Sequence, residues 1–173
     1  MLGPINVDVS RQPADLDVEE TGSTYLENAR LKALAAALRT GCWALADDSG
    51  LEVDALDGAP GLFTARFAAS DHDKLERLQA AMADIPYRSA CFRSAMVLCS
   101  PEGTCDEEAE GFCWGELLHT PAYPGGGIES LFWVREAGCS YGQLNASQLS
   151  RLGSRGKAAR NLAQGLRRRL NLD

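Results

Sequence analysis

The stretch ALADDSGLEVDALDGAPG, residues 44–61, holds the strongest local signals in the sequence. The apolar run at residues 42–46 is typical of a short strand that is buried on both faces. Two adjacent carboxylates, Asp47 and Asp48, follow this run directly, and DGAPG at residues 57–61 has the composition of a turn. The pattern predicts a strand that ends at Asp47 and Asp48, with one carboxylate directed to each face of a sheet.

Helical and strand periodicities alternate on both sides of this stretch. In TGSTYLENARLKALAAALRTG, residues 21–41, Thr24 and Glu27 form a capping-box pattern and Gly41 supplies a stop. Residues 1–20 are expected to be irregular or to hold a short strand around residues 5–9. Further helices are predicted at residues 72–83, 147–152 and 155–170, and strands at residues 89–99, 105–118 and 131–134. We therefore expect an α/β protein, with a mixed sheet flanked by helices, in a single domain that spans residues 1–173.

Composition limits the classes of partner. The chain has 173 residues, 45% of them hydrophobic, and a net charge of −7. This charge argues against general binding to nucleic acid or to an anionic membrane. No apolar run is long enough to span a bilayer and no signal-peptide pattern begins the chain, so a cytoplasmic location is expected. The six cysteines are expected to be free and mostly buried thiols, with disulfides as the alternative.

Several polar residues are candidates for a site, and each has a simpler structural interpretation. Asp47 and Asp48 can bind Mg²⁺ and orient a water, or they can make an Asx turn. Glu20 can be a metal ligand, or a carboxylate that favours a helix N-terminus. Lys32 lies on the helix face that Asn28 also occupies, and this face can point into a cleft or into solvent.

Two further segments can contact an anion. The PGGG segment, residues 124–127, can cradle a phosphate through its backbone amides or can be a flexible turn. Arg155 follows Ser154 at the start of the last predicted helix, where an anion is favoured. A solvated arginine is the alternative for Arg155.

Taken in order, these segments resemble the inosine triphosphate pyrophosphatase (Ham1-like) family. The matching stretches are ETGSTYLENARLKA at residues 20–33, ALADDSGLEVDALDGAPGLFTARFA at 44–68, RSACF at 88–92, EGFCWGEL at 110–117 and SRG at 154–156. The resemblance implies hydrolysis of deaminated purine nucleoside triphosphates (ITP, dITP, XTP) to the monophosphate and pyrophosphate. It also implies an elongated α/β fold with two lobes around a central cleft, and a homodimer.

The resemblance assigns a role to each matching position. Asp48 is the implied general base, and Glu20 and Asp48 are the implied ligands of Mg²⁺. Lys32 is the implied phosphate contact, and Ser49 and Arg155 are expected to lie against the substrate and its base. In the loop that recognises the base, the corresponding substrate-binding positions are Gly126, Gly127 and Glu129.

The sequence also departs from the family pattern. The family's first strand and its T/S-x-N-x-x-K phosphate loop have no counterpart in MLGPINVDVS, residues 1–10, so the fold is expected to lack its first strand and helix. A start codon further upstream or a truncated chain is a further interpretation. The family's GFGYDP loop reads GGGIES at residues 125–130, a family lysine falls near Leu149, and a family histidine is Ser154. These changes leave a second hypothesis, a catalytically degenerate paralogue that acts as a binding or interaction module.

Overall fold

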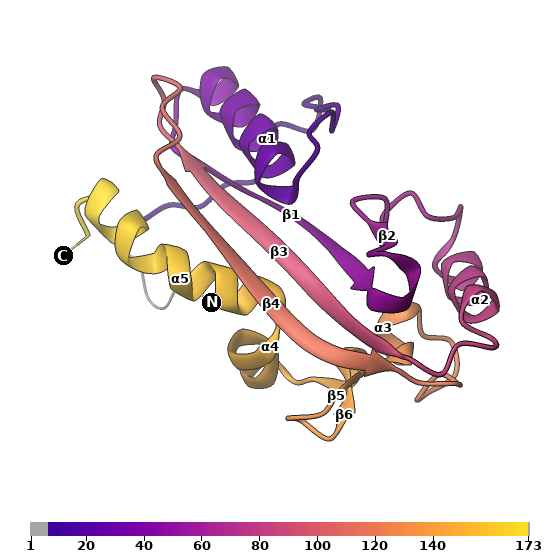
Figure 1. Ribbon diagram of the computed structural model, residues 1–173. Coiled ribbons are helices and arrows are strands. Elements are labelled where there is room, and N and C mark those ends of the chain that lie inside the picture. Colours follow the sequence, from indigo (N-terminus) through magenta and orange to yellow (C-terminus); the bar gives the residue numbers. More distant parts are fainter. Residues whose placement is uncertain (1–6, 173) are drawn as a thin grey trace. The chain divides into compact units, whose positions relative to one another are not determined.

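The computed structural model describes residues 7–172 (Figure 1). Residues 5 and 6 of the strand predicted around residues 5–9 lie outside this described part, and residues 7–20 contain no helix or strand. The helices are α1 (Tyr25–Thr40), α2 (Asp71–Ala81), α3 (Ile128–Leu131), α4 (Ala146–Leu152) and α5 (Ser154–Arg169), with 3-10 turns at Asp54–Leu56 and Tyr141–Gln143. The strands are β1 (Ala44–Val53), β2 (Pro60–Gly61), β3 (Ser89–Cys99), β4 (Glu107–Leu117), β5 (Phe132–Val134) and β6 (Cys139–Ser140).

The strands form one six-stranded sheet in the order β2-β1-β3-β4-β5-β6. The pairs β1–β2, β4–β5 and β5–β6 are antiparallel, and Leu51 lies opposite Gly61 in the first of them. Figure 1 shows β3 running opposite to both of its neighbours, β1 and β4. The α/β fold class is therefore confirmed, whereas the prediction of a mixed sheet is wrong, because the sheet is antiparallel.

Helix α1 forms where the capping pattern predicts it. The Thr24 hydroxyl accepts the backbone N–H of Glu27 at 3.1 Å, and Gly41 ends the helix with a φ of 65°. The Glu27 carboxylate accepts the backbone N–H of Ser23 and also its hydroxyl, and these bonds lower the pKa of Glu27. The first turn of α1 is thus fixed by its own side chains.

The chain divides into two compact units. The first comprises residues 1–48, 94–111 and 154–173, and the second comprises residues 49–93 and 112–153. In the first unit, Val97 and Cys99 of β3 pack against the alanines of α1, whereas Met96 packs against Ala158 and Leu162 of α5. Since neighbouring residues of a strand point to opposite faces, α1 and α5 cover opposite faces of this part of the sheet. The prediction of a single domain stays a prediction.

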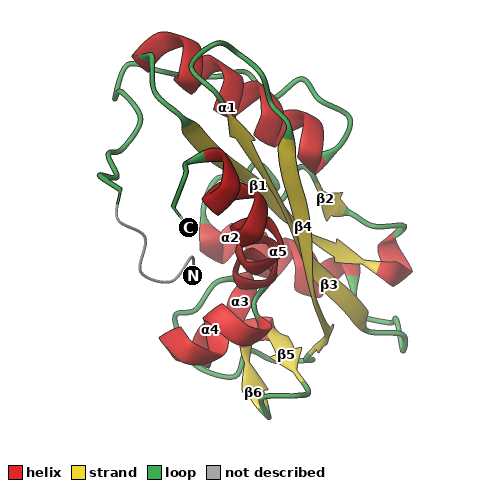
Figure 2. Cartoon of the chain, turned by 90° about the vertical axis from the view of Figure 1, so that its left-hand side faces the viewer, coloured by secondary structure: helices red, strands yellow, loops and turns green. Residues whose placement is uncertain are grey.

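The second unit has a larger apolar core of its own. The expected inward residues of α2, Leu75, Leu78 and Met82, are all buried in it. Phe132 of β5 is fully buried, and its ring lies 4.8 Å from that of Phe92. Helix α4 and the short strands β5 and β6 belong to this unit and lie close together (Figures 1 and 2).

The prediction that the first strand ends at Asp47 and Asp48 is wrong. Strand β1 continues through both aspartates and through Ser49 and Gly50 as far as Val53. Beyond them Leu51 pairs with Gly61, and its N–H donates to Thr64 Oγ1 at 2.9 Å. These long-range contacts hold the backbone extended, although Ser-Gly resembles a turn in isolation.

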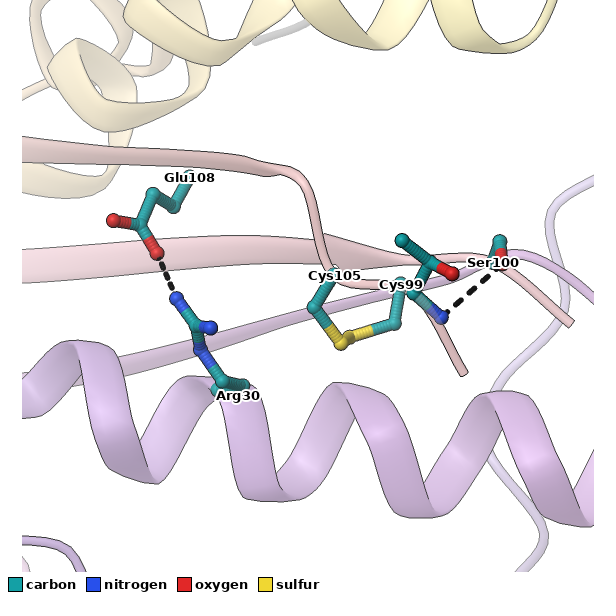
Figure 3. The surroundings of a disulfide bond; sticks show 6 residues. Arg30, Cys99, Ser100, Cys105 and Glu108 are labelled. Atoms are coloured by element: carbon teal, nitrogen blue, oxygen red, sulfur yellow. Dashed lines mark hydrogen bonds and ion pairs between the residues drawn. A yellow bond between two sulfur atoms is a disulfide. The ribbon is translucent and has the colours of Figure 1, made fainter. Parts of the chain in front are cut away.

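The prediction of free cysteines is also wrong for two of the six. Cys99 at the end of β3 and Cys105 before β4 form a disulfide (Figure 3). The two residues are six positions apart in the turn between antiparallel strands, so the hairpin itself brings their side chains together. Cys42, Cys91, Cys113 and Cys139 are free, and Cys91 and Cys113 among them are buried.

Candidate active site

Strand alternation places the paired aspartates on opposite faces of β1. Ala44 and Ala46 pack in the cluster that contains the α1 alanines. Asp48 follows in the same alternation and faces α1, whereas Asp47 faces the start of α5. The prediction that one carboxylate serves each face is confirmed, although the strand does not end there.

Lys32 of α1 joins two of the predicted site residues. Its Nζ donates to Glu20 Oε1 at 2.9 Å and to Asp48 Oδ1 at 3.0 Å. The side chains of Lys32, Glu20 and Asp48 are only 22%, 24% and 11% exposed, respectively. The structure therefore brings together three residues that lie twelve and sixteen positions apart in the sequence.

The charge of Lys32 is stabilised by this arrangement. Burial alone lowers the pKa of the Lys32 ammonium, but the hydrogen bonds to Glu20 and Asp48 and the charges of these carboxylates outweigh burial and raise it. Lys32 therefore remains a cation throughout the physiological range of pH. Two converging carboxylates and one ammonium form a compact charged cluster that is partly shielded from bulk water.

A buried asparagine completes the cluster. Asn28 lies one helical turn before Lys32, is 1% exposed, and donates from Nδ2 to Asp48 Oδ2 at 3.3 Å. Sequence reasoning placed Asn28 on the same helix face as Lys32 but gave it no role. The spacing of four residues shows that Asn28 and Lys32 share a helix face, but it does not show that this face contacts Asp48.

Arg155 at the start of α5 pairs with the other aspartate. Its Nε donates to Asp47 Oδ2 at 2.7 Å, and both side chains are partly exposed. Ser154, where the family has a histidine, is buried, and its hydroxyl bonds that of Ser94 at 2.8 Å. Arg155 therefore has a carboxylate that orients it, whereas the Ser154 side chain is buried and bonds within the protein interior.

The glycine-rich loop is in the second unit and is held by its own side chains. Glu129 Oε1 accepts the N–H of Gly127 at 2.9 Å and the Tyr123 hydroxyl at 3.3 Å. A Cβ on Gly126 would lie 2.5 Å from the Tyr123 ring, so this packing requires glycine at the position where the family has an aromatic residue. Burial, followed by the charge of Glu129, raises the pKa of Tyr123. The backbone N–H of Gly127, which was expected to help bind a phosphate, thus donates to Glu129 instead.

Ser49 follows Asp48 on β1 and is partly exposed, as a substrate contact requires. Alternation directs it away from the face that holds Lys32. On the first unit, Lys32 lines a mostly apolar groove of about 500 Å³ together with residues of β1, α1 and α5.

The donor set of the charged cluster suits a hard divalent cation. Between residues 7 and 172 no group of three or more His, Cys, Asp or Glu side chains forms a ready metal cage. Glu20 and Asp48 nevertheless direct oxygens at one point, which the Lys32 ammonium occupies. Mg²⁺ commonly uses one or two protein carboxylates and completes its shell with waters and phosphate oxygens. The residues present therefore fit Mg²⁺ that is delivered together with a phosphate ligand.

The chain is similar to known proteins over most of its length. The profile of the Ham1 family matches residues 1–165. A dITP/XTP pyrophosphatase of Gloeobacter violaceus is 46% identical over 161 residues, which cover 92% of this chain and 82% of the relative. A dITP/XTP pyrophosphatase of Parasynechococcus marenigrum is 43% identical over 159 residues, which cover 91% and 82% of the two chains.

Solved structures show the same likeness in three dimensions. The Ham1 protein of Staphylococcus aureus superimposes with a TM-score of 0.80 at 35% identity, covering 90% of this chain and 82% of that one. A HAM1 protein of Coxiella burnetii gives the same TM-score and identity over 88% and 81%. Among the described residues, no helix combines the length and the apolarity that crossing a membrane requires.

Proposed function

This chain belongs to the Ham1 family, and from that premise we propose that it hydrolyses deaminated purine nucleoside triphosphates to the monophosphate and pyrophosphate. The observation that carries the proposal is the partly buried cluster in which Lys32 bridges Glu20 and Asp48. Relatives named dITP/XTP pyrophosphatase, at 38–46% identity, support the substrate class. They favour a hydrolase over a degenerate binding module.

In the proposed reaction, water attacks the α-phosphorus and the bond to the bridging oxygen breaks, so that pyrophosphate leaves. Asp48 accepts the proton of that water, a role that suits a carboxylate held in place at both oxygens. Lys32 offsets the negative charge that accumulates on the phosphate oxygens. Glu20 and Asp48 would hold Mg²⁺, which supplies further charge neutralisation when it is bound with the substrate.

The family resemblance assigns further contacts to residues of each unit. The family resemblance assigns Arg155 to the base, with Asp47 orienting its guanidinium, and Ser49 to the substrate, although both lie on the β1 face opposite to Lys32. Gly126, Gly127 and Glu129 would line the base-binding end. Because Glu129 already accepts from Gly127 and Tyr123, base recognition there requires contacts that differ from those of the family loop.

We further propose that the protein works as a homodimer in the cytoplasm. The family resemblance supports the dimer. Four free cysteines are compatible with a reducing compartment, whereas the Cys99–Cys105 disulfide is not typical of one. Light scattering coupled to size exclusion should give about twice the mass of one chain. A mass equal to a single chain at micromolar concentration would refute the dimer without affecting the proposed reaction.

The test of the reaction is a product assay with a matched pair of variants. Purified protein is incubated with Mg²⁺ and ITP, dITP, XTP, GTP or ATP, and phosphorus NMR identifies the products. We expect monophosphate and pyrophosphate from ITP, dITP and XTP. Asp48→Asn should lower kcat about 10²–10⁴-fold, the contribution of a general base.

Asp84→Asn is the control, because Asp84 is exposed and the substitution is chemically the same. It should leave the rate unchanged. Absence of turnover by the wild type on all five triphosphates would refute the proposed function and favour the binding-module hypothesis. Release of inorganic phosphate instead of pyrophosphate would place the cleaved bond elsewhere and contradict the mechanism.

A further inference from the structure

Asn28 is a buried polar side chain with partners on two sides. Its Oδ1 accepts the backbone N–H of Gly22 at 2.8 Å, and its Nδ2 donates to Asp48 Oδ2 at 3.3 Å. The residue is 1% exposed, so water cannot replace either partner. Removing one of these bonds would leave a buried polar group unsatisfied.

The orientation of the Asn28 amide follows from its partners. A backbone N–H can only donate, so the atom that faces Gly22 must be the amide oxygen. The NH₂ group therefore faces Asp48 and donates to it, as a carboxylate requires. Gly22 permits this approach, because a Cβ at that position would lie 2.7 Å from Asn28 Oδ1.

The Asp48 carboxylate is thus held at both of its oxygens by donors from the same helix. Lys32 bonds Oδ1 and Asn28 bonds Oδ2, and these two residues are four positions apart on α1. The Lys32 ammonium donates to Glu20 as well as to Asp48, whereas the NH₂ group of Asn28 donates to Asp48. Without Asn28 the carboxylate would have one donor on this helix and could rotate about its Cβ–Cγ bond.

We propose that Asn28 is the positioning residue of the reaction, which fixes the plane of the Asp48 carboxylate. Through Gly22 it also ties the segment that carries Glu20 to α1. The proposal rests on the proposed function for its catalytic consequence, and on the geometry alone for the Asn28–Asp48 bond. Asn28 itself contacts no substrate in this scheme, since Asp48 lies between it and the reacting water.

The first test separates the two bonds of Asn28 by kinetics. Asn28→Asp keeps an oxygen for Gly22 but replaces the donor to Asp48 with a second acceptor. We expect kcat on dITP to fall by about ten- to a hundredfold, the cost of a misplaced catalytic group. KM should change less than kcat does, because Asn28 itself contacts no substrate.

Asn161→Asp is the matched control, since Asn161 lies on the exposed side of α5 and also donates its amide, to the backbone oxygen of Glu110 at 2.9 Å. It should leave kcat and KM unchanged. If Asn28→Asp kept kcat within twofold, or raised KM alone, the positioning role would be refuted. Asn28→Gln, which keeps an amide, should retain more of kcat than Asn28→Asp does.

The second test needs no activity. Thermal midpoints are measured for Asn28→Asp, Asp48→Asn and the double variant, which reverses donor and acceptor. Asn28→Asp should lower the midpoint by at least about 4 °C, and the double variant should recover most of that loss. Additive shifts in this cycle would overturn the Asn28–Asp48 bond even if turnover is found. If the wild type shows no turnover, the proposed function and the catalytic role of Asn28 are both refuted, whatever the thermal midpoints show about the Asn28–Asp48 bond.

Discussion

At the scale of single residues, Lys32 joins the two carboxylates of the proposed site. It is partly buried beside two carboxylates, and the hydrogen bonds to them raise its pKa in spite of burial. A group whose pKa is raised on folding stabilises the protein below its unfolded pKa, about 10.4, and loses that contribution as the pH rises through the folded value. The cluster therefore contributes its full stability at neutral pH.

Substitution of Lys32 by methionine tests this balance of charges. The variant keeps the length of the side chain but leaves Glu20 and Asp48 without a cation. We expect a loss of about 2 kcal/mol at pH 7 without metal, which corresponds to roughly 4–8 °C in the thermal midpoint. Millimolar Mg²⁺ should then stabilise Lys32→Met more than it stabilises the wild type.

The control is Lys74→Met, which removes an ion pair to the exposed Asp71. Such a surface pair contributes about 0–1 kcal/mol, and Mg²⁺ should not compensate its loss. An identical response of Lys32→Met and the wild type to Mg²⁺ would contradict the assignment of Glu20 and Asp48 as metal ligands.

At the scale of elements, the contact between β4 and α5 depends on small residues. Gly156, Ala158 and Ala159 are buried on the sheet-facing side of α5. Opposite them is Gly111 of β4, where a Cβ would overlap the backbone of Ser154 and Ala158. The helix can therefore approach the strand closely only because this position has no side chain.

Gly111→Ala should consequently destabilise the protein, although alanine is ordinarily the better residue in regular structure. We expect a loss of about 2 kcal/mol, typical of overpacking, or roughly 4–8 °C by differential scanning calorimetry. Gly138→Ala has open space around it but a φ of 66°, so it should cost only about 1–2 kcal/mol. A larger loss for Gly138→Ala than for Gly111→Ala would contradict the close approach.

The C-terminal turn of α5 is joined to the first residue of β4 by charge. Glu107 accepts from Arg168 at 2.8 Å and from Arg169 at 3.0 Å. The hydrogen bond from Arg168 is the larger cause of a lowered Glu107 pKa. A carboxyl with a lowered pKa contributes stability above its unfolded value, and this contribution disappears as the pH falls through the folded value.

A pH series with Glu107→Gln checks this sign. At pH 7 the free energy of unfolding of the wild type should exceed that of the variant by up to about 1 kcal/mol, as expected for a partly exposed cluster. The difference should shrink as the pH falls below the unfolded pKa of about 4.3 and vanish once the pH is below the lowered pKa of folded Glu107. Glu102→Gln, which changes an exposed residue in the turn between β3 and β4, is measured over the same pH series as the control.

At the scale of the whole molecule, acidic residues dominate. The chain has 24 Asp and Glu against 17 Lys and Arg, which gives a net charge of −7. Several of the cationic side chains also form ion pairs with carboxylates, among them Arg155, Arg168 and Arg169. A triphosphate can still be bound at one local cationic point, whereas a long polyanion meets net repulsion.

We therefore expect no measurable binding to duplex DNA at about 150 mM salt. Fluorescence anisotropy of a labelled duplex of about twenty base pairs provides the measurement. Affinity tighter than about 10⁻⁶ M that weakened steeply with salt would contradict this expectation, because such behaviour marks phosphate contacts by a basic surface. A parallel titration of the same duplex with a basic protein shows that the probe is competent.

The limits of the sequence are visible in individual elements. Helix α1 and strand β3 were predictable because caps and apolar periodicity are local properties. Strand β1 was predicted too short, since its second half is stabilised by pairing with β2. The Cys99–Cys105 disulfide was missed because the sequence gives the spacing of cysteines but not the geometry of a hairpin.

The sequence alone determined that Asp47 and Asp48 face opposite sides of a strand, because alternation follows from backbone geometry. It also determined that Asn28 and Lys32 share a helix face. Only the tertiary structure decided that this face meets Asp48 and Glu20, and that Glu129 bonds within its own loop. The physical reason is that local patterns fix the direction of side chains, whereas the packing of distant segments selects their partners.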